Sequence, residues 1–326
     1  LYNRTTTDML FPVQPPFSMG VAVAPFQNIG KMRNKGIDFG ASYEQKIGTD
    51  LTVTLGGNIS TYRNEVLKTT GNKDSKYFGI NDERISDFVV TQQGHPISSF
   101  YGYVVEGIFQ TNAEAEAAAP QFGSPATENK AGRFHFKDVN NDGKIDLNDR
   151  TFIGSPHPDF SYGINLNVTY KFLSLNLFGS GVQGNDIFNY TKYFTDFPTF
   201  LGAKSLRVRD QAWEPGKTDA ILPQVKTADQ VSIQPSSYYI ESGSYFRMKN
   251  IQLTFTVPPS LTSKLKIGPT RVYVQTQNLF TISKYSGMDP EVNSRNFSTG
   301  SDRQIGVDGG TYPVSKQFIV GVNLSF

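Results

Sequence analysis

Apolar and polar residues alternate in the last segment of the chain, SKQFIVGVNLSF (315–326). A period of two residues is the period of a β-strand, whose successive side chains point to opposite faces. Only Ile319 breaks the pattern. The segment predicts a strand with one apolar face and one small or polar face: the apolar set is Phe318, Val320, Val322, Leu324 and Phe326, and the other set is Gly321, Asn323 and Ser325.

The same alternation recurs along the chain. Clear runs lie at 37–44, 51–60, 160–170, 173–177, 250–257 and 271–280, and weaker runs lie at 84–93 and 97–109. Together with 1–10 and 314–326 they predict about ten strands, many of them as long as the roughly 9–11 residues that a tilted membrane strand needs.

The lengths of the connections are an independent indication. Outer-membrane barrels alternate short periplasmic turns with long extracellular loops, whereas a soluble sandwich has no reason to do so. We therefore predict an all-β fold, a segment of a transmembrane antiparallel β-barrel with long extracellular loops and a periplasmic C-terminus. The connections, from the first strand onward, are 11–33 (long), 47–50 (short), 65–83 (long), 94–96 (short), 110–157 (long), 171–172 (short), 183–237 (long), 258–269 (intermediate) and 282–313 (long).

Two of the long loops carry helix signals. The stretch NAEAEAAAP in 110–157 predicts a short helix stopped by Pro120, and LGAKSLRVRDQAW in 183–237 predicts a second one, ended by Pro215-Gly216.

Composition agrees with this architecture. Aromatic residues make up 13% of the 326 residues while only 18% are charged, and the mean hydropathy is −0.37, which suits sheets with one apolar and one wet face. No apolar run is long enough for a transmembrane helix. The net charge of +2 gives no indication of nucleic-acid binding. The absence of cysteine excludes disulfides and thiol chemistry.

The sharpest chemical motif is DVNNDGKIDLND, residues 138–149. It matches the D-x-[DN]-x-[DN]-G calcium loop, with a glycine that permits the turn and a carboxylate at position 12. Aspartate at that position is shorter than the usual glutamate, so Mg²⁺ is an alternative to Ca²⁺. A polar turn without an ion is the other interpretation. The predicted ligands are Asp138, Asn140, Asp142, the Lys144 carbonyl, Asp146 and Asp149.

Evidence for catalysis is thin. His95, His135 and His157 stand in three separate contexts, and we expect each to be a solvated or locally hydrogen-bonded loop residue. No nucleophile elbow, phosphate-binding loop or dinucleotide fingerprint is present. The basic and aromatic stretch 244–250 is better interpreted as a polar face near a membrane rim than as a nucleic-acid patch. We predict that the protein is not an enzyme.

Several segments, in order along the chain, resemble the C-terminal barrel region of the SusC/RagA family of TonB-dependent outer-membrane transporters from Bacteroidota. The resemblance covers essentially all of residues 1–326 and implies one part of a 22-stranded barrel, without the plug domain and early strands. The chain also begins at Leu1 inside a Thr-rich strand, as expected for the later part of a longer protein. The matching segments are NIGKMRNKGIDFGASY (28–43), GHPISSFYGYVVEGIFQ (94–110), 131–170, GNDIFN (184–189), SYFRMKNIQLTFTVP (244–258) and QNLFTISKYSGMDPE (277–291).

The resemblance implies active import of a large nutrient, an oligosaccharide or a peptide, across the outer membrane. It also implies a SusD-like surface lipoprotein as a lid, contact with outer-membrane lipid, and energy from TonB acting on the missing N-terminal part. Loop aromatics would stack on sugars or pack against the lid. They are Tyr190, Phe194, Phe197 and Trp213.

Three other classes of protein remain as alternatives. A SusC-like barrel serving as a structural subunit of a larger envelope complex would have the same sequence features. A self-contained ten-strand outer-membrane enzyme would need clustered Asp and His at the rim, and the histidines are scattered. A soluble calcium-stiffened binding module is disfavoured by the alternation of loop lengths.

Overall fold

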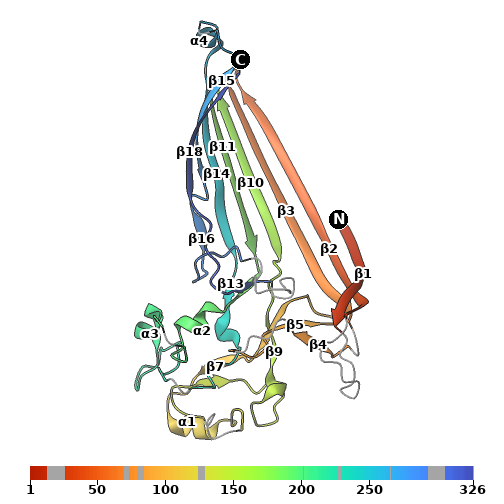
Figure 1. Ribbon diagram of the computed structural model, residues 1–326, viewed down its shortest axis with the longest axis vertical. Helices are drawn as coiled ribbons and strands as arrows, with labels where there is room; N and C mark the ends of the chain where they lie inside the picture. The colour runs from red at the N-terminus through yellow and green to blue at the C-terminus, as the bar shows by residue number, and fades with distance from the viewer. Residues whose placement is uncertain are drawn as a thin grey trace.

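The structure is a computed structural model, and it describes residues 1–12, 26–69, 73–78, 84–123, 129–200, 202–226, 229–264, 266–292 and 305–325. A tall, curved antiparallel sheet, here called the wall, stands on a body of short strands and helices (Figure 1). The short hairpin turns at 48–50 and 171–172 and the C-terminal end of the chain lie at the end of the wall opposite the body.

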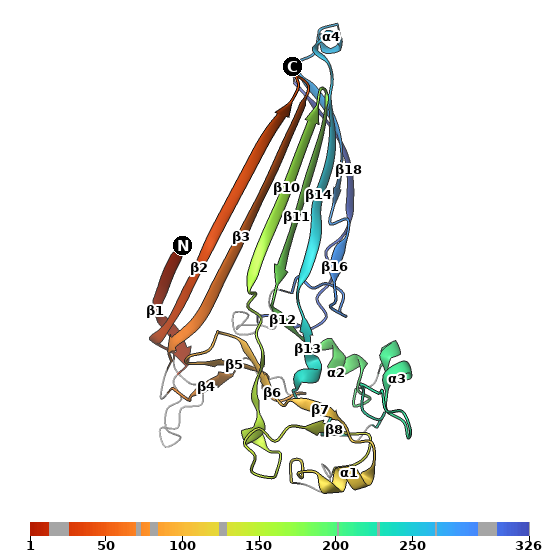
Figure 2. The same ribbon diagram turned by 180° about the vertical axis from the view of Figure 1, so that it is seen from behind.

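In the described parts of the chain, the wall is a nine-stranded sheet. Eight strands pair in the order β1-β2-β3-β10-β11-β14-β15-β18, and β16 (Thr281–Ser283) pairs with the end of β14. In the described residues β1 and β18 are its two edges, at opposite sides of the curved sheet (Figure 2). The bounds are β1 Tyr2–Pro12, β2 Phe26–Ile47, β3 Leu51–Lys68, β10 Phe160–Tyr170, β11 Leu173–Gln183, β14 Tyr245–Thr256, β15 Thr270–Gln277 and β18 Gln317–Leu324.

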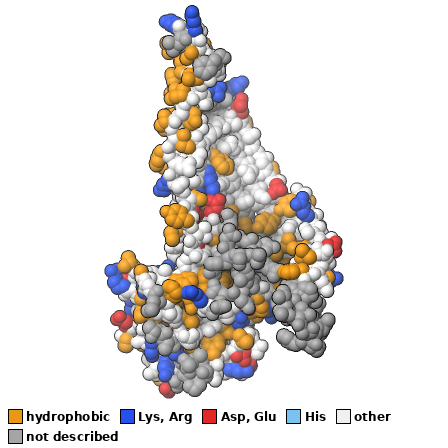
Figure 3. All heavy atoms as spheres, viewed as in Figure 1, with side chains coloured by type: hydrophobic (Ala, Val, Ile, Leu, Met, Phe, Trp, Pro, Cys, Tyr) orange, Lys and Arg blue, Asp and Glu red, His pale blue; other side chains and the backbone are white. Residues whose placement is uncertain are grey.

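The predicted alternation determines the two faces of the wall. Val320 pairs with Val274, and Phe39 pairs with Ile59, so large apolar side chains of neighbouring strands stand side by side on one face and are exposed. Figure 3 shows such side chains along the β14–β18 side of the wall, beside a broad area with few of them. Phe326, the predicted last residue of the C-terminal strand, lies outside the described residues.

The opposite face of the wall carries a row of amides that crosses four strands. Gln275 Nε2 on β15 donates to Asn250 Oδ1 on β14 at 2.7 Å. Asn250 Nδ2 donates to Asn176 Oδ1 on β11 at 3.0 Å, and Asn176 donates to Asn167 on β10. We call these four residues the amide ladder. This face is therefore polar, as the prediction requires.

The strand count differs from the prediction at 84–93 and 97–109. These segments lie outside the wall, in small sheets of the body, and β10 pairs directly with β3. Because both predicted strands leave the wall together, the alternation of long and short connections is preserved. The apolar residues of these two segments face the interior of the body, where Val89, Val90 and Phe100 are core residues.

Among the residues that the structure describes, the body contains three small sheets. One has the order β4-β5-β6-β9, the second pairs β7 with β8, and the third has the order β13-β12-β17, with β12 and β17 parallel. The bounds are β4 Lys76–Phe78, β5 Val89–Gln92, β6 Ser99–Gly102, β7 Val105–Ile108, β8 Phe134–Phe136, β9 Thr151–Gly154, β12 Asp186–Asn189, β13 Ile240–Ser242 and β17 Val307–Asp308.

The helices are short. The predicted helix in 110–157 is α1 (Asn112–Ala117), and the one predicted in 183–237 is α3 (Leu206–Gln211). No helix among the described residues has the length and apolar character needed to cross a membrane. The other helical elements are η3 (Leu147–Asp149), α2 (Thr191–Thr195), η4 (Ser237–Tyr239) and, at the hairpin end of the wall, α4 (Pro259–Thr262).

The core of the body is rich in aromatic rings. Phe88 stacks on Phe188 with ring centroids 4.1 Å apart, and Phe188 stacks on Tyr239 at 5.1 Å. Of the aromatics predicted to contact sugars or a lid, Tyr190, Phe197 and Trp213 are buried in this core. They stabilise the body itself, because rings enclosed by other core residues present no face for a ligand to stack on.

Candidate functional site

The six predicted metal ligands lie in one exposed loop that leads from β8 to β9. Gly143 has a φ of +81°, which is the left-handed conformation that favours glycine at the turn of such a loop. Asp142 is exposed and Asp138 is half-buried on the outer arm, whereas Asp149 is fully buried beneath it. The sequence motif therefore folds as a compact polar turn with one carboxylate inside.

Side-chain oxygens hold this loop by accepting from its own backbone. Asp138 Oδ2 accepts from the amide of Gly143 at 2.8 Å, and Asp142 Oδ1 accepts from that of Lys144 at 3.2 Å. The two oxygens of Asp149 accept from the amides of Val139 at 2.9 Å and Asp146 at 2.8 Å, which joins the two ends of the loop.

The cation beside these carboxylates is the ammonium of Lys144. Its Nζ lies 2.8 Å from Asp146 Oδ2 and 3.9 Å from Asp142 Oδ2. No three His, Cys, Asp or Glu side chains of the described residues are gathered as a metal site. The donor set is all oxygen, which Ca²⁺ and Mg²⁺ prefer. Calcium binding at this loop stays a prediction.

Each of the three histidines has its own set of contacts. His95 stacks on Phe152 with centroids 3.7 Å apart, and His135 Nε2 is 3.9 Å from Glu106 Oε2. His157, just before β10, joins the wall to the body: its Nε2 is 2.8 Å from the Ile97 carbonyl and its Nδ1 is 3.1 Å from the Tyr62 hydroxyl. Burial lowers the pKa of His157.

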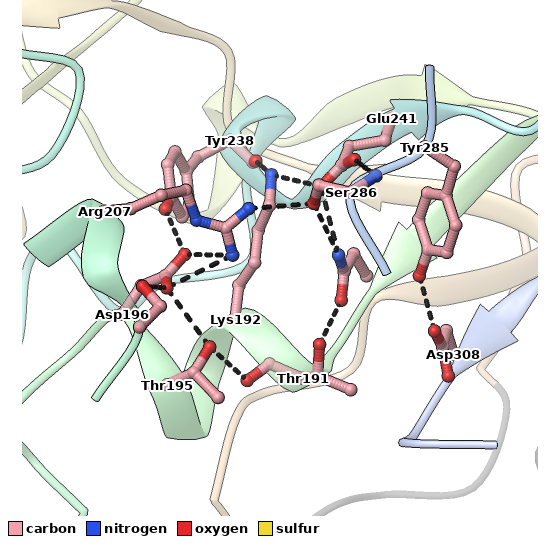
Figure 4. Close-up of polar contacts among 12 residues, drawn as sticks. Thr191, Lys192, Thr195, Asp196, Arg207, Tyr238, Glu241, Tyr285, Ser286 and Asp308 are labelled. Carbon is pink, nitrogen blue, oxygen red and sulfur yellow. Dashed lines mark hydrogen bonds and ion pairs between the residues drawn. The ribbon is translucent and has the colours of Figure 1, made fainter. Parts of the chain in front are cut away.

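An ion pair between Asp196, whose side chain is fully buried, and Arg207 lies on the left side of Figure 4. Arg207 Nη2 is 3.0 Å from Asp196 Oδ2 and 3.2 Å from Oδ1. The Asp196 carboxylate also accepts from the Tyr238 hydroxyl at 2.6 Å and from the Ser205 hydroxyl at 2.6 Å. Burial raises the pKa of Tyr238, and the neighbouring carboxylate raises it further. This group joins α2, α3 and η4.

A second buried pair lies beside the first. Lys192 Nζ is 2.9 Å from Glu241 Oε1 and donates to the Tyr238 carbonyl at 2.7 Å. The Glu241 carboxylate also accepts from the Ser286 amide at 2.8 Å and from its hydroxyl at 2.7 Å. Burial raises the pKa of Glu241, but Lys192 and the Ser286 donors outweigh burial and leave that pKa below its usual value.

Ser286 connects the two ion pairs. Its hydroxyl donates to Glu241 and accepts from Arg207 Nη1 at 2.8 Å, as Figure 4 shows. The adjacent Tyr285 hydroxyl donates to Asp308 Oδ2 at 2.5 Å. The segment after β16 is thus fixed to the body at two places, the ion pairs and β17.

The stretch 244–250 holds the same segment from the wall side. Arg247 on β14 is 2% exposed, and its guanidinium lies 2.6 Å from Asp289 Oδ1 and 2.6 Å from Glu291 Oε2. Lys249 Nζ lies 2.7 Å from Glu291 Oε2. The sequence predicted a polar face near a membrane rim here, and the structure shows a charge network around the buried Arg247. Such a network fixes geometry, because a buried charge is tolerated only when it is paired.

These networks link residues that are far apart in the sequence. Arg207 and Ser286 are 79 residues apart, and Arg247 and Glu291 are 44 apart. Sequence reasoning missed them because each charged residue alone looks like a solvated surface residue. Their arrangement binds loops rather than a reactant, because every carboxylate is already occupied by donors from the chain. The networks therefore form a frame where the body meets the wall.

Comparisons with known proteins find relatives by sequence but not by family model. No family model matches the chain. The TonB-dependent receptor P3 of Formosa agariphila is 32% identical over 331 residues, which cover 100% of this chain and 32% of that receptor. The TonB-dependent receptor SusC of Bacteroides thetaiotaomicron is 29% identical over 332 residues, covering 100% of this chain and 29% of that one.

Solved structures give the same result. The RagAB peptide transporter superimposes with a TM-score of 0.76 at 26% identity, covering 99% of this chain and 32% of its own. The open-open state of the RagAB peptide importer gives a TM-score of 0.75. The chain spans about a third of the length of these relatives, and they are named as receptors and importers rather than enzymes. Over its full length the chain is homologous to the TonB-dependent receptors of the SusC and RagA type, and it corresponds to their C-terminal portion.

Proposed function

We propose that residues 1–326 form the C-terminal part of the barrel and the extracellular mouth of an outer-membrane importer that is driven through TonB. The observation that carries this proposal is the wall: an antiparallel sheet with an exposed apolar face and a polar opposite face, matched over 99% of the chain by the RagAB transporter. Such faces suit lipid on one side and an aqueous lumen on the other.

The placement of the body supports the proposed orientation. Short turns are typical of the periplasmic side of such barrels, and long loops of the extracellular side. Here the short turns and the C-terminal end share one end of the wall, and the body stands at the other (Figure 1). We therefore place the C-terminus in the periplasm and the body outside the cell.

The partners follow from the relatives. RagAB is named as a peptide transporter, and SusC as a TonB-dependent receptor. We propose a SusD-like surface lipoprotein as a lid on the body, TonB acting on segments outside this chain, and a large nutrient, an oligosaccharide or a peptide, as the substrate. The ion-paired frame around Asp196 and Arg247 would keep the mouth in shape while a lid opens and closes above it.

An uptake experiment tests import. The source bacterium, lacking the gene and complemented with the full-length protein, is given either a fluorescent oligopeptide mixture or fluorescent malto-oligosaccharides. We expect uptake of one probe to be restored by complementation and abolished by a protonophore. Unchanged uptake of both probes, together with loss of a large envelope complex in the deletion strain, would favour the structural-subunit alternative.

We also propose that the loop 138–149 binds Ca²⁺ as a clip that orders the mouth. The support is the oxygen donor set of Asp138, Asn140, Asp142, Asp146 and Asp149 with the Lys144 carbonyl, and the turn that Gly143 permits. Bound calcium would replace the Lys144 ammonium as the counter-charge of these carboxylates. Any effect on uptake would then be indirect.

A further inference from the structure

The apolar face of the wall has a hollow over β2, β3 and β10. Its volume is about 590 Å³. Ala41 pairs with Gly57 across the two strands, and the small size of both residues leaves the space open. Larger residues border it on both sides: the pair Phe39 and Ile59 on one side, and the pair Tyr43 and Leu55 on the other. Since these side chains are exposed, the hollow opens outward from the sheet.

Basic residues lie on the same face, closer to the body. Lys35 and Arg63 are direct cross-strand partners, and the unbroken register from Met32 to Ile47 places them on the face that carries Phe39 and Ile59. Closer to the start of β2, Lys31 is the cross-strand partner of Lys68, and both side chains are exposed. Like charges placed directly opposite one another on a sheet are destabilising unless a counter-charge is present.

We call Lys31, Arg33, Lys35, Arg63 and Lys68 the basic patch. The carboxylates among the described residues neutralise its positive charge only in part. Glu65 Oε2 lies 2.6 Å from Arg33 Nη2, and Asp159 Oδ1 lies 3.2 Å from Arg63 Nη1. Within the part of the chain that the structure describes, Lys35 forms no ion pair with a carboxylate. An anion from outside the chain would complete the pairing.

The distance between the patch and the hollow suits a lipid. Lys35 and Phe39 are four residues apart on one strand, about 13 Å at roughly 3.3 Å per residue. One leaflet of a bilayer core is about 15 Å thick. A headgroup at Lys35 would therefore place its acyl chain against the hollow.

We propose that β2, β3 and β10 form a binding site for the phosphorylated glycolipid of the outer leaflet. Lys35 and Arg63 hold its phosphate, and an acyl chain fills the hollow around Ala41 and Gly57. The inference rests on the proposed function for the placement of this face in the outer leaflet. Because the occupant carries both an anion and an apolar chain, it accounts for both features of the surface.

The test measures the binding of lipid A to the purified full-length protein in detergent by native mass spectrometry. Lys35→Gln with Arg63→Gln should weaken binding about 30-fold, since a cation near a lipid surface contributes about a fivefold gain in affinity. Lys46→Gln, at the hairpin end of β2, is the matched charge control. Ala41→Phe should reduce binding by filling the hollow, whereas Val320→Phe on the distant β18 should not. Lys35→Gln alone is the milder variant should the double variant fold poorly.

Dephosphorylated lipid A and phosphatidylglycerol are the comparison ligands. We expect the first to bind as weakly as lipid A binds the double variant. Equal binding of phosphatidylglycerol would overturn the glycolipid assignment, and equal binding of lipid A to the wild type and all variants would overturn the site. Membrane fractionation of the wild type distinguishes these outcomes, because absence from the outer membrane would instead refute the proposed function.

Discussion

Removing the Asp196 carboxylate should loosen the frame around the mouth. The side chain of Asp196 is 0% exposed and that of Arg207 is 28% exposed. Removing one partner of a buried ion pair typically costs about 3–5 kcal/mol, because the other charge stays desolvated and unpaired. In Asp196→Ala, the hydroxyls of Tyr238 and Ser205 also lose their acceptor. The opening of α2 and α3 should therefore become more favourable by about 3–5 kcal/mol.

Hydrogen–deuterium exchange of the full-length protein measures this change locally. Since about 1.4 kcal/mol corresponds to a factor of ten, exchange in 190–211 should accelerate by about 2 to 3.5 orders of magnitude. The matched control is Asp210→Ala, whose carboxylate pairs with Arg209 at 2.6 Å but is 52% exposed. Exposed pairs contribute about 0–1 kcal/mol. If Asp196→Ala accelerates exchange no more than Asp210→Ala, the buried network does not stabilise the mouth and the reasoning is wrong.

Three further predictions concern the wall, the junction and the loop. Val320→Arg should destabilise the barrel by about 2–4 kcal/mol and Asn323→Arg by much less, measured by heat modifiability; equal effects would contradict the assigned faces. The pKa of His157 lies below the ordinary value of 6.5, so its contribution to stability is present above pH 6.5 and is lost as pH falls toward the folded-state pKa. His157→Gln should flatten that part of a thermal-stability profile, and an unchanged profile would refute the linkage. Asp138→Ala with Asp142→Ala, or a calcium chelator, should raise proteolysis of 138–149 without affecting barrel assembly; no change in either case would leave the motif as a turn only.

Much of the wall could be predicted because the residue pattern of each of its strands is set within that strand. A strand between lipid and water must alternate, so segments such as 160–170 and 250–257 are recognisable in the sequence alone. Short buried strands of a compact body also contain apolar runs, and for that reason 84–93 and 97–109 were wrongly assigned to the wall.

The networks of the mouth could not be predicted in the same way. Asp196, Arg207 and Glu241 are brought together by packing of the aromatic core, and no local pattern encodes that packing. The loop 138–149 is intermediate: its turn was predictable, whereas the role of Asp149 as a buried acceptor for both ends of the loop depends on the tertiary fold.

The amide ladder has a consequence under the proposed function, in which a nutrient passes along this face of the wall. From Gln275 to Asn167 each amide donates one hydrogen bond to the next in one direction, so the row is paired along its length and carries no net charge. Each amide keeps further hydrogen-bonding capacity, because it has two N–H donors and an oxygen with two lone pairs. A polar solute beside it can exchange single hydrogen bonds without meeting an unpaired ion that would hold it. Chains of such bonds polarise one another, which favours their mutual pairing over capture of the solute. Under the proposed function, the ladder would give this part of the lumen a neutral polar surface, along which a large hydrated molecule would move without a fixed charge to retain it.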